Sequence, residues 1–143
     1  VYKRQGLDYA LSMEGSLKLK EVSYIHSESY AAGELKHGTI SLIDEDVPVI
    51  AVATQTGIIP KTISNVVEVK SRGAKVILVC TDACARELKD GVADYVIEIP
   101  HTDELLMPIT AVVPLQILAY YTSINRGIDP DKPKNLAKSV TVE

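Results

Sequence analysis

The sequence contains no tryptophan and no phenylalanine, and its only aromatic residues are seven tyrosines. Nucleic-acid-binding surfaces commonly stack bases on aromatic side chains and neutralise phosphates with clustered lysine and arginine. Here the net charge is −4, and the 15 lysine and arginine residues are scattered along the chain. These deficits argue against nucleic acid as a partner.

Cysteine is scarce, and several common catalytic motifs are missing. Cys80 and Cys84 are the two cysteines, and no second Cys/His pair completes a zinc site around them. We expect free thiols, as in a reducing compartment. The sequence also lacks a P-loop, a GxGxxG turn and a GxSxG elbow, which excludes the usual NTPases, dinucleotide enzymes and serine hydrolases. We expect no metal and no cofactor.

Long hydrophobic runs are missing as well. None reaches the roughly 18 residues that a membrane-spanning helix needs, and the first residues do not resemble a signal peptide. The chain has 143 residues, of which 46% are hydrophobic and 24% charged, as in a globular domain with a real core. We therefore expect a cytoplasmic protein that does not bind membranes.

Three short apolar runs predict buried strands, and helical patterns separate them. The expected strands are Val47–Ala53, Lys75–Cys80 and Tyr95–Ile99, and the expected helices after the first two strands are Ile59–Arg72 and Ala83–Lys89. The apolar-rich segment Asp103–Asn125 should form a long helix that starts or kinks near Pro108 and Pro114. This alternation predicts an α/β fold, a doubly wound, flavodoxin-like three-layer α-β-α sandwich around a parallel sheet. Residues 1–127 form the expected domain, and the proline-containing residues 128–143 form a tail.

The segment Ala10–Tyr24 predicts a helix with an unusual charged stripe. Glu14, Lys18 and Glu21 recur at i, i+4 and i+7, so they share one side of the helix. Apolar residues flank this stripe on both sides and small or polar residues lie opposite: Leu11, Val22 and Ile25; Met13, Leu17 and Tyr24; Ser12, Ser16, Lys20 and Ser23.

This pattern predicts that the stripe runs down the buried side of the helix. Buried charges need a partner, a ligand or a cleft. Glu14 precedes Lys18 in the favourable order for an ion pair, which leaves Glu21 as the candidate for proton transfer. The alternative is a narrower apolar arc with a solvated ion-pair ladder beside it.

His37 ends a predicted short helical turn, Ala31–His37, that Gly38 caps. The unpaired carbonyl groups of a helix end favour the imidazolium form, so a surface cap is the simplest interpretation of this histidine.

Three stretches together resemble one enzyme family. They are Met13–Glu21 (MEGSLKLKE) followed by Ser23–His26 (SYIH), Gly33–Gly38 (GELKHG) and Asn135–Glu143 (NLAKSVTVE). The chain is similar, in register from Leu7 onward, to the last part of the glutamine–fructose-6-phosphate aminotransferases (isomerizing), the glucosamine-6-phosphate synthases. This resemblance implies a sugar isomerase (SIS) domain. It also implies conversion of fructose 6-phosphate and glutamine into glucosamine 6-phosphate and glutamate.

The resemblance also implies roles for six residues. Lys138 forms a Schiff base with the open-chain ketose, Glu21 moves a proton between C1 and C2, and His37 assists ring opening in the site of a neighbouring subunit. The remaining three contact the sugar or tune Glu21: Lys18, Glu14 and the backbone of Ala137. From the pattern alone, Lys138 is an ordinary solvated lysine in a terminal tail.

The family implies partners that the sequence does not contain. The glutaminase domain with its N-terminal cysteine and the first SIS subdomain, which binds the sugar phosphate, are absent from these 143 residues. We expect a homodimer, and an isolated fragment that is inactive as a synthase. Two alternatives remain: a stand-alone SIS module that senses a sugar phosphate and regulates a partner, and a scaffold that contributes only a dimer surface.

Overall fold

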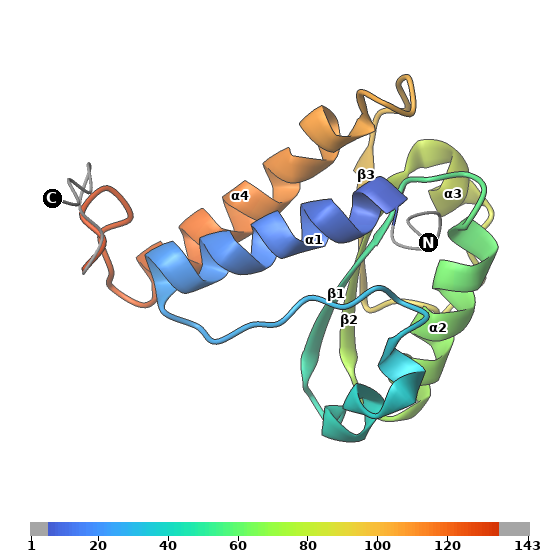
Figure 1. Ribbon diagram of the computed structural model, residues 1–143, viewed down its shortest axis with the longest axis horizontal. Coiled ribbons are helices and arrows are strands. Elements are labelled where there is room, and N and C mark those ends of the chain that lie inside the picture. Colours follow the sequence, from blue (N-terminus) through green and yellow to red (C-terminus); the bar gives the residue numbers. More distant parts are fainter. Residues whose placement is uncertain (1–5, 135–143) are drawn as a thin grey trace, which may run out of the picture.

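The computed structural model describes residues 6–134, which form three layers (Figure 1). The central layer is a parallel sheet in the order β1-β2-β3, built from Pro48–Ala53, Lys75–Thr81 and Tyr95–Ile99. Helices α1 and α4 cover one face, and α2 and α3 cover the other. The α-β-α sandwich and the positions of all three strands are confirmed.

The helices have the following bounds, in chain order: α1 Gly6–Lys18, which continues as the π-helical turn η2 Leu19–Ser23; the 3₁₀ turns η3 Leu35–His37 and η4 Thr39–Leu42; α2 Ile59–Ser71; α3 Asp82–Arg86; and α4 Met107–Asn125. Helix α3 ends three residues before the predicted end because Glu87 and Leu88 close turns instead of continuing the helix. The helical turn before Gly38 is confirmed but shorter, since helix is found only from Leu35 to His37.

Side chains of β2 alternate between two apolar cores, as the period of a strand requires. Val76, Leu78 and Cys80 point into the core shared with α2 and α3, whereas Val79 packs with α1 and α4. Cys80 is a fully buried free thiol, and its burial raises its pKa to about 12. The expectation of unpaired cysteines is confirmed.

Helix α4 begins at Met107, next to Pro108 as expected for a start near a proline, with Pro108 in its first turn and Pro114 inside it. Its length and composition alone would permit it to cross a membrane, although our reading of the sequence found no such segment. Five of its residues are buried, and Met107, Ala111 and Leu115 pack in the core over β2 and β3. Packing therefore places α4 in the α-β-α sandwich.

Candidate functional site

The charged residues of the first helix form an ion-pair ladder. Lys18 Nζ lies 2.7 Å from Glu21 Oε2 and 3.5 Å from Glu14 Oε1. The hydrogen bond from Lys18 to Glu21 raises the pKa of the lysine, so Lys18 is cationic at neutral pH. Glu21 is therefore the closer carboxylate, contrary to the expectation that Glu14 would be the main partner of Lys18.

The ladder lies at the border of the packed surface and not down its middle. The side chains of Glu14, Lys18 and Glu21 are 41%, 33% and 28% exposed. The flank expected to be buried is exposed as well, because Met13 and Leu17 have whole-residue exposed fractions of 46% and 43%. The prediction of a charged stripe on the buried side was therefore wrong for this chain.

Small residues explain the difference, because they form the face that α1 turns toward α4. A Cβ atom on Gly15 would lie only 2.9 Å from Leu115 Cδ1. Ser16 and Ser23 are buried too, although both were assigned to the outer face. The small side chains let the two helices approach closely, and this contact rotates the ladder toward the edge of the domain.

Glu21 lies in the π-helical turn η2, a type of distortion that often occurs at functional sites. Tyr24 ends this turn with a φ of 55°, in the left-handed region that non-glycine residues rarely adopt. From α4, the hydroxyl of Ser123 lies 2.8 Å from the carbonyl oxygen of Val22. The backbone around Glu21 is thus held by tertiary contacts.

The described part of the C-terminal tail leads back to this turn. The backbone N–H of Lys134 donates a hydrogen bond to the hydroxyl of Tyr24. Two predicted site residues, Ala137 and Lys138, lie outside the described residues. Lys138 is four residues beyond Lys134, a distance of at most about 14 Å for extended chain.

His37 does not join the ladder within one chain. It is exposed at the end of η3, and the neighbouring Lys36 pairs with Glu68 of α2 at 2.6 Å. Figure 1 shows η3 beside α2, away from the end of α1 where Lys18 and Glu21 lie. The structure therefore brings together three of the predicted site residues, Glu14, Lys18 and Glu21, and leaves His37 apart.

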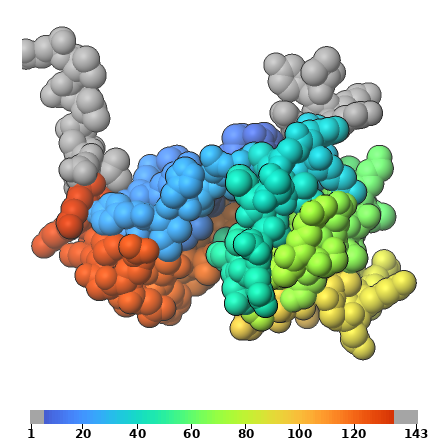
Figure 2. Space-filling view, turned by 90° about the horizontal axis from the view of Figure 1, so that it is seen from below, coloured from blue at the N-terminus to red at the C-terminus, as the bar shows by residue number. Residues whose placement is uncertain are grey.

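A cavity of about 550 Å³ lies between α1, β1 and the connection from Ile25 to Ile43. In Figure 2 a hollow separates α1 and α4, in blue and orange, from the η3–η4 turns, in cyan. The walls are mostly apolar and include Leu19, Ile50, Val52, Leu115 and Leu118. None of the four predicted site residues that the structure describes, Glu14, Lys18, Glu21 and His37, lines this cavity.

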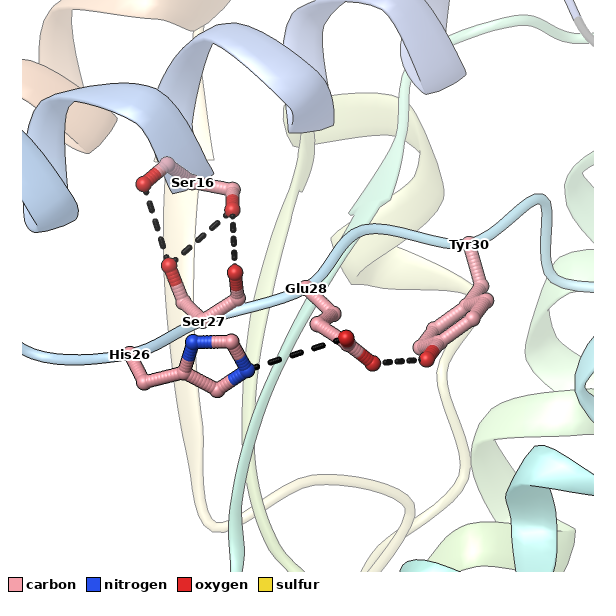
Figure 3. Close-up of polar contacts among 5 residues, drawn as sticks. All are labelled: Ser16, His26, Ser27, Glu28 and Tyr30. Carbon is pink, nitrogen blue, oxygen red and sulfur yellow. Dashed lines mark hydrogen bonds and ion pairs between the residues drawn. The ribbon is translucent and has the colours of Figure 1, made fainter.

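One wall of the cavity carries a polar cluster that our sequence analysis missed (Figure 3). Ser16 Oγ donates to Ser27 O at 2.9 Å, and Ser27 Oγ donates to Ser16 O at 3.0 Å, which ties the connection to α1. Glu28 accepts a hydrogen bond from Tyr30 and lies 3.6 Å from His26 Nε2. Ser16 and His26 belong to stretches that carry the family resemblance, but neither was assigned a role, and the extended path of the connection brings the cluster together.

No group of three or more His, Cys, Asp or Glu side chains within residues 6–134 is arranged to hold a metal ion.

Comparison with known proteins identifies the class of this domain. The model of the SIS domain family matches residues 5–126, and the chain belongs to that family. Within it, the chain matches glutamine–fructose-6-phosphate aminotransferases (isomerizing): it is 57% identical over 139 residues to the enzyme of Clostridium perfringens and 50% identical over 143 residues to that of Bacteroides thetaiotaomicron. These matches cover 97% and 100% of the chain but only 23% of each relative.

Solved structures agree with the sequence relatives. The C-terminal domain of glucosamine-fructose-6-phosphate aminotransferase from Francisella tularensis superposes with a TM-score of 0.82 at 40% identity, over 87% of this chain and 34% of that one. Glucosamine-6-phosphate deaminase from Thermotoga maritima superposes with a TM-score of 0.72 at 29% identity, over 94% and 37%. The chain thus corresponds to the C-terminal SIS part of the aminotransferases.

Proposed function

We propose that this chain is the C-terminal part of the isomerase half of a glutamine–fructose-6-phosphate aminotransferase. The longer protein converts fructose 6-phosphate and glutamine into glucosamine 6-phosphate and glutamate in the cytoplasm. The observation that carries the proposal is the contact between Lys134 and Tyr24, which places the last described residue of the tail beside the turn that holds Glu21. The NLAKSVTVE motif, Asn135–Glu143, begins one residue later.

In the proposed mechanism, the neutral amine of Lys138 attacks the C2 carbonyl of the open-chain ketose and forms an imine with loss of water. Ammonia from the glutaminase domain then displaces the lysine. Glu21, as a carboxylate, takes a proton from C1 and delivers it to C2, while the proton of the C1 hydroxyl passes to the nitrogen. This leaves an amine on C2 and an aldehyde at C1. The backbone of Ala137 contacts the sugar beside Lys138.

The ladder supplies the electrostatics that this proton transfer needs. Glu21 must be a carboxylate to act as a base, and its Oε2 lies 2.7 Å from Nζ of the cationic Lys18. Glu14, at 3.5 Å from the same ammonium group, helps to keep Lys18 charged and in place. Closure of the tail over this border would exclude water from a surface that is exposed in the single chain.

His37 is proposed to act in a neighbouring subunit of a homodimer, where it assists opening of the sugar ring. Its position supports this role, because His37 is exposed and lies apart from the ladder of its own chain. The first SIS subdomain and the glutaminase domain of the longer protein would supply the phosphate site and the ammonia. The isolated 143-residue chain is therefore expected to be inactive as a synthase.

The test is borohydride trapping of the full-length protein with radiolabelled fructose 6-phosphate. The wild-type protein should be labelled irreversibly, Lys138→Ala should lose the label, and the matched control Lys134→Ala should keep it, since Lys134 contributes only its backbone to the contact with Tyr24. Glu21→Gln should retain the label yet lose turnover by about 100-fold or more.

Equal labelling of the wild type and Lys138→Ala would remove the lysine from its proposed role. Binding of fructose 6-phosphate without any trapping in either protein would instead favour a regulatory SIS module that senses the sugar phosphate.

A further inference from the structure

Helix α4 ends beside the turn η2 (Figure 1) and then reverses the chain. Gly127 has a φ of 70°, and its backbone N–H donates to Ile124 O at 2.9 Å. The N–H of Ile128 donates to Ser123 O at 3.0 Å. This pair of bonds around a left-handed glycine is a Schellman motif. It fixes the direction in which residues 128–134, the tail loop, leave the helix.

The hydroxyl of Ser123 connects the start of the tail loop with η2. Ser123 is fully buried, and its Oγ lies 2.8 Å from Val22 O and 3.1 Å from Ile128 O. A hydroxyl has one proton, so it donates to these two carbonyl oxygens in turn or shares the proton between them. Because η2 ends at Ser23, no following helical turn supplies an N–H to Val22 O. Ser123 therefore provides the donor that the helix lacks at this point.

The far end of the tail loop also returns to η2. The backbone N–H of Lys134 donates to the hydroxyl of Tyr24, which ends the turn three residues after Glu21. Tyr24 has a left-handed backbone conformation that glycine or asparagine adopts at lower cost. The contact made by its side chain therefore explains why a tyrosine occupies this position.

Between these two contacts the tail loop has little conformational freedom. Pro130 and Pro133 fix their own φ angles. The N–H of Lys132 donates to Asp129 O at 3.2 Å, and that of Asp131 donates to Asp129 Oδ1 at 3.0 Å. A loop that is already ordered loses little entropy when its two ends are held. The position of η2 therefore determines where the tail loop ends.

We propose that Tyr24 and Ser123 are positioning residues for the reaction, because their hydroxyls fix the tail loop to the turn that carries Glu21. This inference rests on the proposed function, in which Glu21 and Lys138 act on one sugar. The two ends of the loop are held one and three residues after Glu21, and Lys138 lies four residues beyond the loop. Loss of either hydroxyl should leave the sugar bound but slow the steps that need both groups.

Borohydride trapping under single-turnover conditions in the full-length protein tests the role of Tyr24. Tyr24→Phe removes only the hydroxyl. The rate of trapping of radiolabelled fructose 6-phosphate and kcat should both fall about tenfold, the effect of one lost hydrogen bond. KM for fructose 6-phosphate should stay within about twofold of the wild-type value. Tyr95→Phe is the matched control, because it makes the same chemical change at an exposed tyrosine of β3.

Ser123 is tested in the same way. Ser123→Ala should slow trapping about tenfold, and Thr122→Ala is the matched control, because the Thr122 hydroxyl donates to Leu118 O within α4 at 2.7 Å. Release at either end frees the tail loop, so Tyr24→Phe/Ser123→Ala should lose less than the product of the two single losses. Single losses that multiply strictly would overturn a loop held at two ends. If Ser123→Ala does not fold, Tyr24→Phe decides alone.

The outcomes separate this inference from the function on which it rests. If the wild type is trapped and Lys138→Ala is not, but Tyr24→Phe is trapped at the wild-type rate, the positioning role is overturned and the proposed function is kept. A raised KM together with a lowered midpoint of thermal unfolding would assign Tyr24 to the stability of the fold and would also overturn the role. A wild type that is not trapped would overturn both.

Discussion

Gly15 shows how much one residue determines in this domain. Its missing side chain allows α1 to lie against Leu115 of α4, and that contact sets which face of α1 is buried. A glycine within a helix costs about 1 kcal/mol relative to alanine, and the close approach of Leu115 explains why glycine occupies this position. The identity of the approaching residue became known only from the fold.

We predict that Gly15→Ala destabilises the domain by about 1 to 3 kcal/mol, because the new methyl group would have to displace Leu115 in a packed core. Gly33→Ala is the matched control, since no atom lies within 4 Å of a Cβ at that position. Urea unfolding of the two variants measures the difference. The double variant Gly15→Ala/Leu115→Ala should lose less stability than the two single changes add up to, and strict additivity would contradict this account.

At the scale of elements, one carboxylate joins α2, β2 and the turn before β3. Asp94 Oδ2 accepts from Val76 N at 2.8 Å and lies 2.5 Å from Lys70 Nζ. The hydrogen bond from Lys70, followed by that from Val76, lowers the pKa of Asp94 to about 2. A carboxylate with a lowered pKa stabilises the fold when it is ionised.

The pH dependence of stability should reveal this junction. The contribution of Asp94 is fully present above the pKa of the unfolded state, 3.8, and is lost as the pH falls through about 2. Asp94→Asn should therefore flatten the decline of the unfolding free energy across that window, as measured by urea titrations at several pH values. The exposed Asp90 provides the control, and an equal effect of Asp90→Asn would contradict the assignment to Asp94.

At the scale of the whole molecule, a large apolar surface stays uncovered. Eight residues of α4 and the turn before it are exposed: Leu105, Leu106, Ile109, Val113, Ile117, Tyr120, Tyr121 and Ile124. Soluble monomers rarely expose apolar patches of this extent, which usually mark interfaces. The chain spans about 23% of the length of its relatives, so the remainder of such a protein has room to cover this surface.

We expect Ile117→Lys to improve the behaviour of the 143-residue chain but to destabilise the full-length protein. In the 143-residue chain it should reduce self-association, measured by sedimentation, because it places a charge on the apolar surface. In the full-length protein it should lower thermal stability, because the same lysine would then be buried. Val67→Lys on α2 is the control with similar exposure, 48% against 50%. A loss of stability only in the 143-residue chain would contradict this prediction.

How well each feature could be predicted depends on how far apart in the sequence the interacting residues lie. Strands Lys75–Thr81 and Tyr95–Ile99 were predictable because their apolar pattern is local, and Gly38 marked the end of the turn at His37. The buried side of α1 could not be predicted, since Ser16 and Ser23 look like surface residues until distant parts of the chain cover them, as Ser27 does for Ser16. The contacts of Glu28 with His26 and Tyr30 span only two residues, but they depend on the extended path of the connection, which no local pattern predicts.

The sequence by itself determined the order of strands and helices and, through its resemblance to the aminotransferases, the family to which the chain belongs. Hydrogen bonding along the backbone and apolar periodicity act over a few residues, so they can be read from the order of amino acids. Only the tertiary structure decided which side of α1 is buried, that Lys18 pairs most closely with Glu21, and that the edge of β1 borders a cavity. These features depend on contacts between residues far apart in the chain, and such contacts form only when the layers pack.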